Sequence, residues 1–227
     1  MTGYNALIRE HVKARDCARD GLKVMSSLFS AYVEALYQTV STACVNVAGK
    51  GDVSMDEGMA LVKDAMVRVV RGPNKVMFIG NGGSAGIAGH MAIDFTKNGG
   101  VRSLTFNDAS SLTCLGNDLG YDQVFAKQVE MHGVNGDILI AISSSGESKN
   151  ILNAVDAARA KKCFVVTLSG FSDGNALRKA GDVNFYVASR AYGFVETAHQ
   201  AILHAILDTA MGWSADAPME QPTKAVG

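Results

Sequence analysis

Two sets of polar and ionisable side chains recur at helical spacing in the sequence. His90 and Asp94 are four residues apart, and Glu196, Gln200 and His204 repeat that interval near the C-terminus. Residues four apart in a helix lie on one face. Two imidazoles, a carboxylate and a further oxygen ligand are groups that bind zinc. A lone histidine is more often a hydrogen-bonded residue without a metal, so both interpretations stay open.

A glycine-rich loop would bring a ligand close to these side chains. Residues 80–84 read GNGGS and directly follow an apolar run at residues 76–79. The glycines let a ligand approach the backbone, and Asn81 and Ser84 can contact hydroxyl groups. The loop also fits the G-x-G-x-x-[GA] pattern of dinucleotide sites, with Asp108 near the expected ribose-binding acid. Short glycine patterns are common, and a dinucleotide leaves the next loop unexplained.

A serine-rich loop follows another apolar run and is better suited to a phosphate monoester. Its hydroxyls come from Ser143, Ser144, Ser145 and Ser148. Gly146 lets the backbone turn, and the N-terminus of a helix follows, where free N–H groups and the helix dipole favour an anion. The alternative is a capping box formed by Ser144 and Glu147. It accounts for two of the residues and can coexist with phosphate binding. We therefore favour a phosphosugar over a dinucleotide.

The elements that position these loops alternate between strand and helix. Short β-rich runs occur at residues 76–79, 102–106, 138–142, 163–168 and 183–187. Residues 154–161 are helical between two of them, and a last helix is expected from about residue 196 to residue 213. This alternation predicts an α/β fold with a parallel sheet covered by helices on both faces. Ligands bind such sheets at the carboxyl ends of the strands.

The segments at the two ends of the chain have a different character. Residues 1–70 show no clear strand, but Leu28, Phe29 and Tyr32 recur at helical spacing, as do apolar residues within 59–70. A turn is expected at residues 49–52 and a helix start at Ser54. Helices this apolar need a partner surface, either the rest of the chain or another copy of it. The polar tail, residues 214–227, is expected to be disordered.

Composition argues against several classes of partner. The 227 residues carry a formal net charge of -1, whereas broad nucleic-acid binding needs a basic face. No apolar stretch reaches membrane-spanning length, and the N-terminus lacks an apolar signal core. We therefore expect a cytoplasmic protein without a membrane partner. The four cysteines form no CxxC pair, which predicts reduced thiols.

Four stretches of the sequence together resemble the sugar isomerase (SIS) fold. They read GNGGS, CLGNDLGYDQVFAKQVE, AISSSGES and HQAILHAIL, and the resemblance covers roughly residues 20–212. More narrowly, they are similar to phosphoheptose isomerases. The resemblance implies a flavodoxin-like three-layer αβα sandwich with a five-stranded parallel sheet, within a single domain of residues 1–213. It makes residues 1–70 a helical oligomerisation segment of a homotetramer with active sites at subunit interfaces.

The same resemblance implies a role for each motif residue. The four serines would hold the phosphate. The sugar would be contacted by Asn81, Gly82, Ser84, Asn117, Asp118 and Glu196, with Asn117 and Asp118 expected in a turn. Asp94 would be the catalytic base and His204 the acid. One Zn²⁺ per subunit would be bound by His90, Asp94, Glu196 and His204, and no nucleotide cofactor is expected.

Three positions depart from the family's pattern. Asp94 stands where the family has Glu, Glu196 where it has Gln, and Gly193 where it has Asp. Asp shortens the reach of the carboxylate by one methylene, about 1.5 Å, and the added charge of Glu strengthens a divalent metal site. Isomerisation needs a base that removes the proton next to the carbonyl and an acid or metal that stabilises the enediolate.

These departures leave three functions open. The first is isomerisation of sedoheptulose 7-phosphate to a heptose 7-phosphate by enediol proton transfer, in lipopolysaccharide precursor biosynthesis. The second is isomerisation of another phosphosugar. The third is a non-catalytic, DiaA-like tetrameric scaffold that binds a replication initiator and needs no intact base or acid.

Overall fold

The computed structural model describes residues 19–216, with side chains from residue 27 onward. Two compact units divide the chain, the first ending at Gln38 and the second beginning at Thr39. The start of the expected oligomerisation segment and most of the tail expected to be disordered lie outside the described residues. No helix in the described part of the chain combines the length and apolar character that crossing a bilayer requires.

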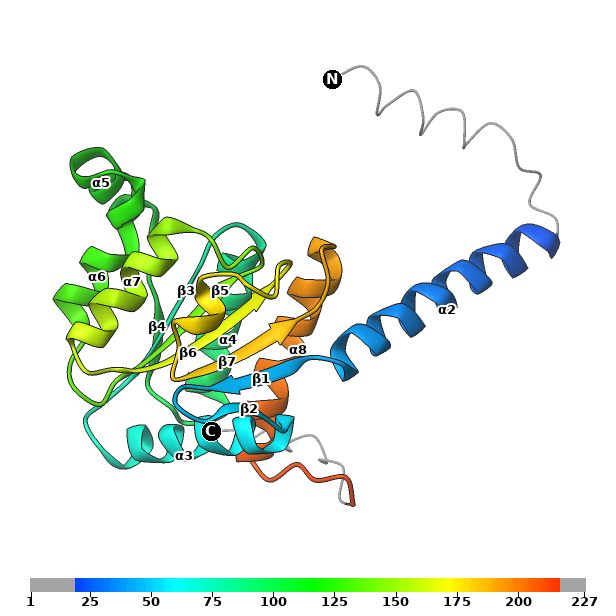
Figure 1. Cartoon of the computed structure of the whole chain (residues 1–227), viewed down its shortest axis with the longest axis horizontal. Coiled ribbons are helices and arrows are strands. Elements are labelled where there is room, and N and C mark those ends of the chain that lie inside the picture. Colours follow the sequence, from blue (N-terminus) through cyan, green and yellow to red (C-terminus); the bar gives the residue numbers. More distant parts are fainter. Residues whose placement is uncertain (1–18, 217–227) are drawn as a thin grey trace, which may run out of the picture. The chain divides into compact units, whose positions relative to one another are not determined.

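Helix α2 (Arg19–Ser41) provides all of the described part of the first unit (Figure 1). It confirms the helix predicted from the apolar spacing. Large apolar side chains along it are exposed, namely Leu28, Phe29, Tyr32, Val33 and Tyr37. At 100° per residue, these five side chains form one broad stripe that covers about half of the helix circumference. An exposed apolar stripe of this kind marks an interaction surface.

A seven-stranded sheet in the order β2-β1-β7-β6-β5-β3-β4 forms the centre of the second unit (Figure 1). Five strands are parallel and confirm the predicted runs: β3 (Val76–Gly80), β4 (Ser103–Thr105), β5 (Ile138–Ser143), β6 (Phe164–Gly170) and β7 (Val183–Val187). Their spatial order, counted along the chain, is the flavodoxin-like 2-1-3-4-5, which confirms the α/β class. The strand order reverses between β3 and β5, where ligands bind in such sheets.

The expectation of no strand before residue 70 is wrong. β1 (Cys44–Val47) and β2 (Gly51–Val53) form an antiparallel hairpin around the predicted turn, and β1 pairs antiparallel with β7. Gly49 and Gly51 adopt φ angles of 76° and 89°, which only glycine takes readily. Strands of four and three residues are too short to show alternation in the sequence. The sheet therefore has seven strands rather than five.

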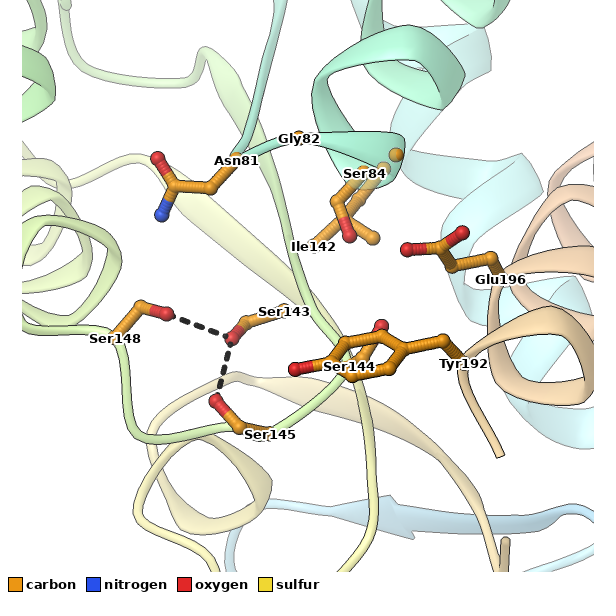
Figure 2. Close-up of a pocket in the computed structure, with 11 residues that line it drawn as sticks. Asn81, Gly82, Ser84, Ile142, Ser143, Ser144, Ser145, Ser148, Tyr192 and Glu196 are labelled. Carbon is orange, nitrogen blue, oxygen red and sulfur yellow. Dashed lines mark hydrogen bonds between the residues drawn. The ribbon is translucent and has the colours of Figure 1, made fainter. Parts of the chain in front are cut away.

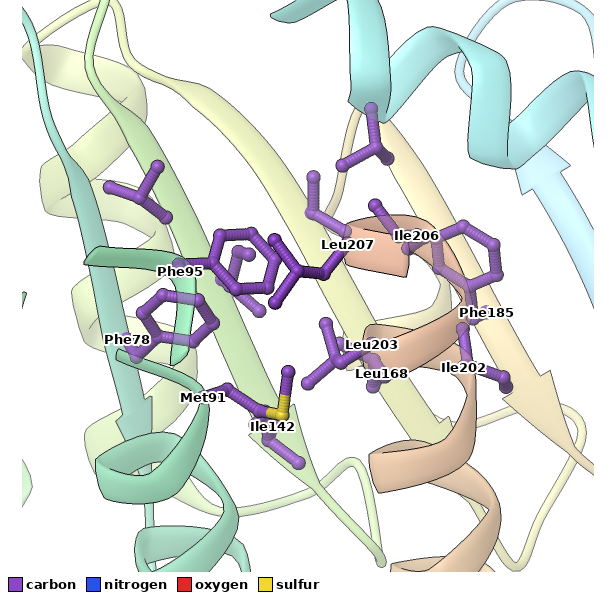
Figure 3. Packing of buried hydrophobic residues seen from close by; sticks show 14 of the residues in the cluster. Phe78, Met91, Phe95, Ile142, Leu168, Phe185, Ile202, Leu203, Ile206 and Leu207 are labelled. Atoms are coloured by element: carbon purple, nitrogen blue, oxygen red, sulfur yellow. The ribbon is translucent and has the colours of Figure 1, made fainter. Parts of the chain in front are cut away.

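Helices cover both faces of this sheet. On one face lie α3 (Met55–Arg71), α4 (Gly83–Lys97) and α8 (Tyr192–Ala210). On the other lie α5 (Ala109–Leu119), α6 (Val124–His132) and α7 (Lys149–Ala160), with the short helices η1 (Tyr121–Gln123) and η2 (Leu177–Lys179). Figure 3 shows the larger core, where Phe78 of β3 and Phe95 of α4 pack edge to face with ring centroids 5.1 Å apart.

A helix start could be predicted where a capping side chain marks it. Ser54 caps α3, because its side chain accepts the N–H of Glu57 at 3.2 Å, as predicted. Helix α8 begins four residues earlier than expected, at Tyr192 rather than Glu196. Its N-cap, Ala191, has no capping side chain, so the sequence carried no start signal there.

Helices α4 and α8 run side by side in the same direction. Gly83 at the start of α4 lies against Glu196, and His90 further along lies against His204. Both helices therefore start at the carboxyl edge of the sheet. From there their axes run parallel to each other and away from that edge. This arrangement places both predicted histidine sets in one region.

Candidate active site

A pocket of about 250 Å³ lies at the carboxyl ends of β3 and β5 (Figure 2). It is lined by the glycine loop, the serine loop and the start of α8. It brings together most of the predicted phosphate and sugar residues: Asn81, Gly82, Ser84, Ser143, Ser144, Ser145, Ser148 and Glu196. The pocket therefore coincides with the position where the strand order reverses.

Asn117 and Asp118 do not reach this pocket. They lie in the last turn of α5 rather than in the expected turn, and both are exposed. Asn117 Nδ2 donates to Asp118 Oδ1 at 2.8 Å. Within the chain, these two residues contact each other. The glycine loop and the serine loop line the pocket without them.

The serine loop is organised by its own hydroxyl groups. Ser143 Oγ donates to Ser148 Oγ at 3.3 Å and lies 3.5 Å from Ser145 Oγ. Gly146, with a φ angle of 68°, turns the chain and donates its N–H to Ser143 Oγ at 3.2 Å. The Ser144 hydroxyl is buried and has no hydrogen-bond partner among the residues that the structure describes. Such orphaned groups are rare in folded proteins and fit a ligand oxygen.

The capping-box interpretation of Ser144 and Glu147 is wrong. Helix α7 begins at Lys149, its N-cap is Ser148, and no side chain forms a cap hydrogen bond. Glu147 instead accepts the N–H of Ala176 at 2.9 Å, which ties the serine loop to the segment after β6. The N-terminus of α7 follows the serine hydroxyls without a side-chain cap. This is the arrangement that favours an anion.

The amide of Asn81 is held in place rather than free. Asn81 Oδ1 accepts hydrogen bonds from Asn150 Nδ2 and from the hydroxyl of Tyr121, both at 3.0 Å. Asn81 Nδ2 donates to Asn150 Oδ1 at 2.9 Å. One N–H of this amide therefore stays available for a sugar hydroxyl. Next to it, Gly82 caps α4 with a φ angle of 55° and no side chain.

His90, Asp94 and His204 form a second group, further along α4 and α8. Asp94 Oδ2 lies 3.3 Å from His90 Nε2 and 4.0 Å from His204 Nδ1. One ligand atom from each residue lies within 4.8 Å of the others. Two imidazoles and a carboxylate at this spacing fit a zinc ion with an open position. The side chain of His90 is 47% exposed, so the group is open to a ligand.

Glu196, the fourth predicted metal ligand, lies outside this group. It precedes His204 by eight residues on α8, which is about 12 Å along a helix axis. Its carboxylate lies at the pocket, against Gly83. Three of the four predicted ligands therefore come together, and the fourth lines the pocket instead.

His199 lies between Glu196 and His204 in the sequence but faces the core. Its side chain is completely buried, and its Nε2 lies 3.1 Å from the carbonyl oxygen of Ser169. A carbonyl only accepts, so Nε2 carries the proton. Burial lowers the pKa of His199 to about 4. The residue is therefore neutral near pH 7 and supports the fold rather than the site.

The sequence interpretation missed two residues of this region. Asn150 fixes the amide of Asn81 through two hydrogen bonds. Its position two residues after Ser148, where a helix was expected to start, could have indicated that it lies near the serine loop. Tyr192 lines the pocket from the first position of α8. An uncapped helix start gave no indication that an aromatic side chain there would face a ligand.

Comparisons with known proteins agree with this geometry. The SIS domain profile matches residues 53–170. Phosphoheptose isomerase 2 of Campylobacter jejuni is 38% identical over 167 residues, or 69% of this chain and 83% of that protein. Phosphoheptose isomerase of Colwellia psychrerythraea is 36% identical over 157 residues, or 64% of this chain and 80% of that protein.

A solved structure is similar over nearly its whole length. The phosphoheptose isomerase GmhA from Neisseria gonorrhoeae superimposes with a TM-score of 0.70 at 30% sequence identity, covering 83% of this chain and 99% of that chain. Together with the two loops at the carboxyl edge of the sheet, these matches show that the chain belongs to the SIS domain family and, within it, to the phosphoheptose isomerases.

Proposed function

We propose that this protein is an aldose–ketose isomerase that converts sedoheptulose 7-phosphate into a D-glycero-heptose 7-phosphate by enediol proton transfer. The observation that carries the proposal is the pairing of two features on α4 and α8. A pocket of serine hydroxyls lies where the helices start, and a His–Asp–His group lies about two turns along them. The relatives named above carry the same activity in their names.

The phosphate would occupy the serine loop. Ser143, Ser145 and Ser148 already point their hydroxyls toward one another there, and the buried Ser144 hydroxyl adds a fourth donor. The uncapped start of α7 supplies the positive end of a helix dipole. These donors fit a phosphate monoester at the end of a sugar.

The length of the site supports a long sugar. From ordinary bond lengths, a seven-carbon chain with a terminal phosphate is on the order of 10 Å long. Glu196 and His204 are separated by about 12 Å along α8. A heptose phosphate held at the serines would therefore extend its carbonyl end toward His204, past Ser84, Gly82 and the free N–H of Asn81. Glu196 would contact a hydroxyl near the phosphate end.

Asp94 and His204 would move the proton. Asp94 would take the proton from the carbon next to the carbonyl, and His204 would protonate the oxygen that becomes a hydroxyl. Their side chains approach to 4.0 Å, so both can face adjacent carbons of one substrate. A zinc ion held by His90, Asp94 and His204 would polarise the carbonyl and stabilise the developing negative charge. The close grouping of all three residues favours an enzyme over a non-catalytic scaffold.

Copies of the protein would associate through α2. Its exposed apolar stripe supports a homotetramer formed by residues 1–70, as in the predicted domain of residues 1–213. Asn117 and Asp118, exposed on α5, would contact the sugar in a site completed by a neighbouring subunit. A heptose phosphate substrate would place the enzyme in the cytoplasm, in lipopolysaccharide precursor biosynthesis.

The test is proton exchange followed by NMR. Sedoheptulose 7-phosphate is incubated in D₂O with the zinc-loaded protein, and we expect an aldose product with deuterium at C2. His204→Ala should abolish product and exchange, whereas His132→Ala, an exposed histidine outside the site, should keep both. Absence of turnover and exchange in the unaltered protein would sink this substrate and return attention to another phosphosugar or the scaffold.

A further inference from the structure

Tyr192 forms a wall of the pocket that no loop motif predicts. It is the first residue of α8 and lines the pocket together with Glu196, four residues later on the same face of the helix. Figure 2 shows its phenol ring extending from α8 into the pocket, in the direction of the serine loop. The ring therefore faces the hydroxyl groups proposed to hold the phosphate.

The position of this ring is fixed by Phe171. The two rings pack edge to face with centroids 5.0 Å apart and an interplanar angle of 77°. Phe171 donates its N–H to Ser189 at 2.9 Å and accepts the Tyr186 hydroxyl at 3.1 Å through its carbonyl oxygen. Its φ angle of 57° is unfavourable for a side chain of this size. Conformations of this kind persist where surrounding contacts fix them, often beside functional sites.

The phenol is available to a ligand. Tyr192 is 61% exposed, and no hydrogen bond to its hydroxyl occurs within residues 27–216. The pocket residues described in the structure include no Lys or Arg, and Glu196 is their one charged member. Among the residues that this chain contributes to the pocket, only neutral donors can hold a phosphate, so each additional donor has a large effect on affinity.

We propose that Tyr192 is a substrate-binding residue that closes the phosphate pocket. Its hydroxyl donates a hydrogen bond to a phosphate oxygen from the side opposite the serines, and its ring covers the ester oxygen and excludes water. The proposal rests on the phosphate-binding part of the proposed function. It adds an aromatic donor that the serine loop does not supply, and it favours terminal phosphate monoesters.

The test compares three variants by titration calorimetry with inorganic phosphate and with sedoheptulose 7-phosphate. Tyr192→Phe removes the donor and keeps the ring, and Tyr192→Ala removes both. Trp213→Ala removes an exposed aromatic side chain beyond the other end of α8. A hydrogen bond to a charged group corresponds to about a tenfold change in affinity. We expect Tyr192→Phe to weaken both ligands about tenfold, Tyr192→Ala to weaken them further, and Trp213→Ala to leave them unchanged.

Kinetics separate binding from a structural effect. Tyr192→Phe should raise KM with little change in kcat, and its zinc content and thermal unfolding should match the unaltered protein. Unchanged phosphate affinity in Tyr192→Phe would overturn the proposal, even if the enzyme isomerises sedoheptulose 7-phosphate. Conversely, phosphate affinity that depends on Tyr192 in a protein without isomerase activity would support this inference and reject the proposed substrate.

Discussion

The carboxylate of Glu196 occupies the space in which a side chain of residue 83 would lie. A Cβ atom built on Gly83 would come within 2.4 Å of both Oε1 and Oε2 of Glu196. The close approach joins the start of α4 to the start of α8, so the two walls of the pocket have a fixed spacing. Glycine at residue 83 is thus required by a neighbour rather than by its own backbone angles.

Gly83→Ala should therefore damage the site. The methyl group would displace the Glu196 carboxylate from the pocket, and we expect at least a tenfold loss of kcat/KM. The unfolding free energy should change little, because the displaced group is the end of a flexible, partly exposed side chain. Gly86→Ala is the matched control, because a Cβ there meets nothing within 4 Å. It should keep activity and gain up to about 1 kcal/mol of helix stability. Equal losses of kcat/KM in both variants, with urea unfolding showing that both are folded, would contradict the role given to Gly83.

Asp94 should be essential as a base. Asp94→Asn keeps the shape but removes the carboxylate, and general-base catalysis typically contributes about 10²–10⁴-fold. We expect a loss of kcat in that range, measured with sedoheptulose 7-phosphate. Asp156→Asn, at an exposed position on α7, should behave like the unaltered protein. Full activity of Asp94→Asn would assign the proton transfer to another group.

Zinc binding should depend on three residues and not on Glu196. His90→Ala and His204→Ala should each reduce zinc content well below one ion per subunit, measured by metal analysis after dialysis, because they remove ligands from the His–Asp–His group. Glu196→Gln should retain zinc and alter KM instead. Loss of zinc in Glu196→Gln would show that the Glu196 carboxylate also binds the metal.

Acid should destabilise the fold through His199. Burial lowers the pKa of His199 to about 4, from an ordinary value of 6.5. The folded state keeps the imidazole neutral, whereas the unfolded chain binds a proton below pH 6.5. The stabilising contribution is therefore complete above pH 6.5 and is lost as the pH falls toward 4. Between pH 7 and pH 5 we expect a loss of about 2 kcal/mol of unfolding free energy from this residue.

Urea unfolding of the metal-free protein at both pH values provides the measurement. His199→Gln keeps a donor for the Ser169 carbonyl and does not titrate, so its unfolding free energy should change less between the two pH values. The remaining histidines are present in both proteins and cancel in the comparison. An identical pH dependence in the two proteins would contradict a buried neutral His199.

Local signals explain which parts of the structure were predictable. The five parallel strands and both loops were found because glycine and serine interrupt apolar runs there. His90 and Asp94 were paired correctly, since a four-residue interval is a contact within a single helix. The same four-residue interval, taken twice, led us to group Glu196 with His204. Eight residues are about two helical turns, so the two side chains share a face but lie about 12 Å apart along the helix.

Contacts between distant segments were not predictable in the same way. The hairpin of β1 and β2 is stabilised by pairing with β7, more than 130 residues later in the chain. Tyr192 depends on Phe171, which comes from the loop after another strand. The unpartnered Ser144 hydroxyl became visible only once the loop was folded, because a sequence does not show which hydroxyl is left without a partner.

The edges of the sheet also decide how copies of this protein can associate. Both outer strands, β2 and β4, are three residues long. Short edge strands offer few free backbone groups, which disfavours strand addition between molecules and the aggregation that it starts. The proposed homotetramer would therefore form through helical surfaces such as that of α2, where side-chain fit would select the partner and limit the number of copies.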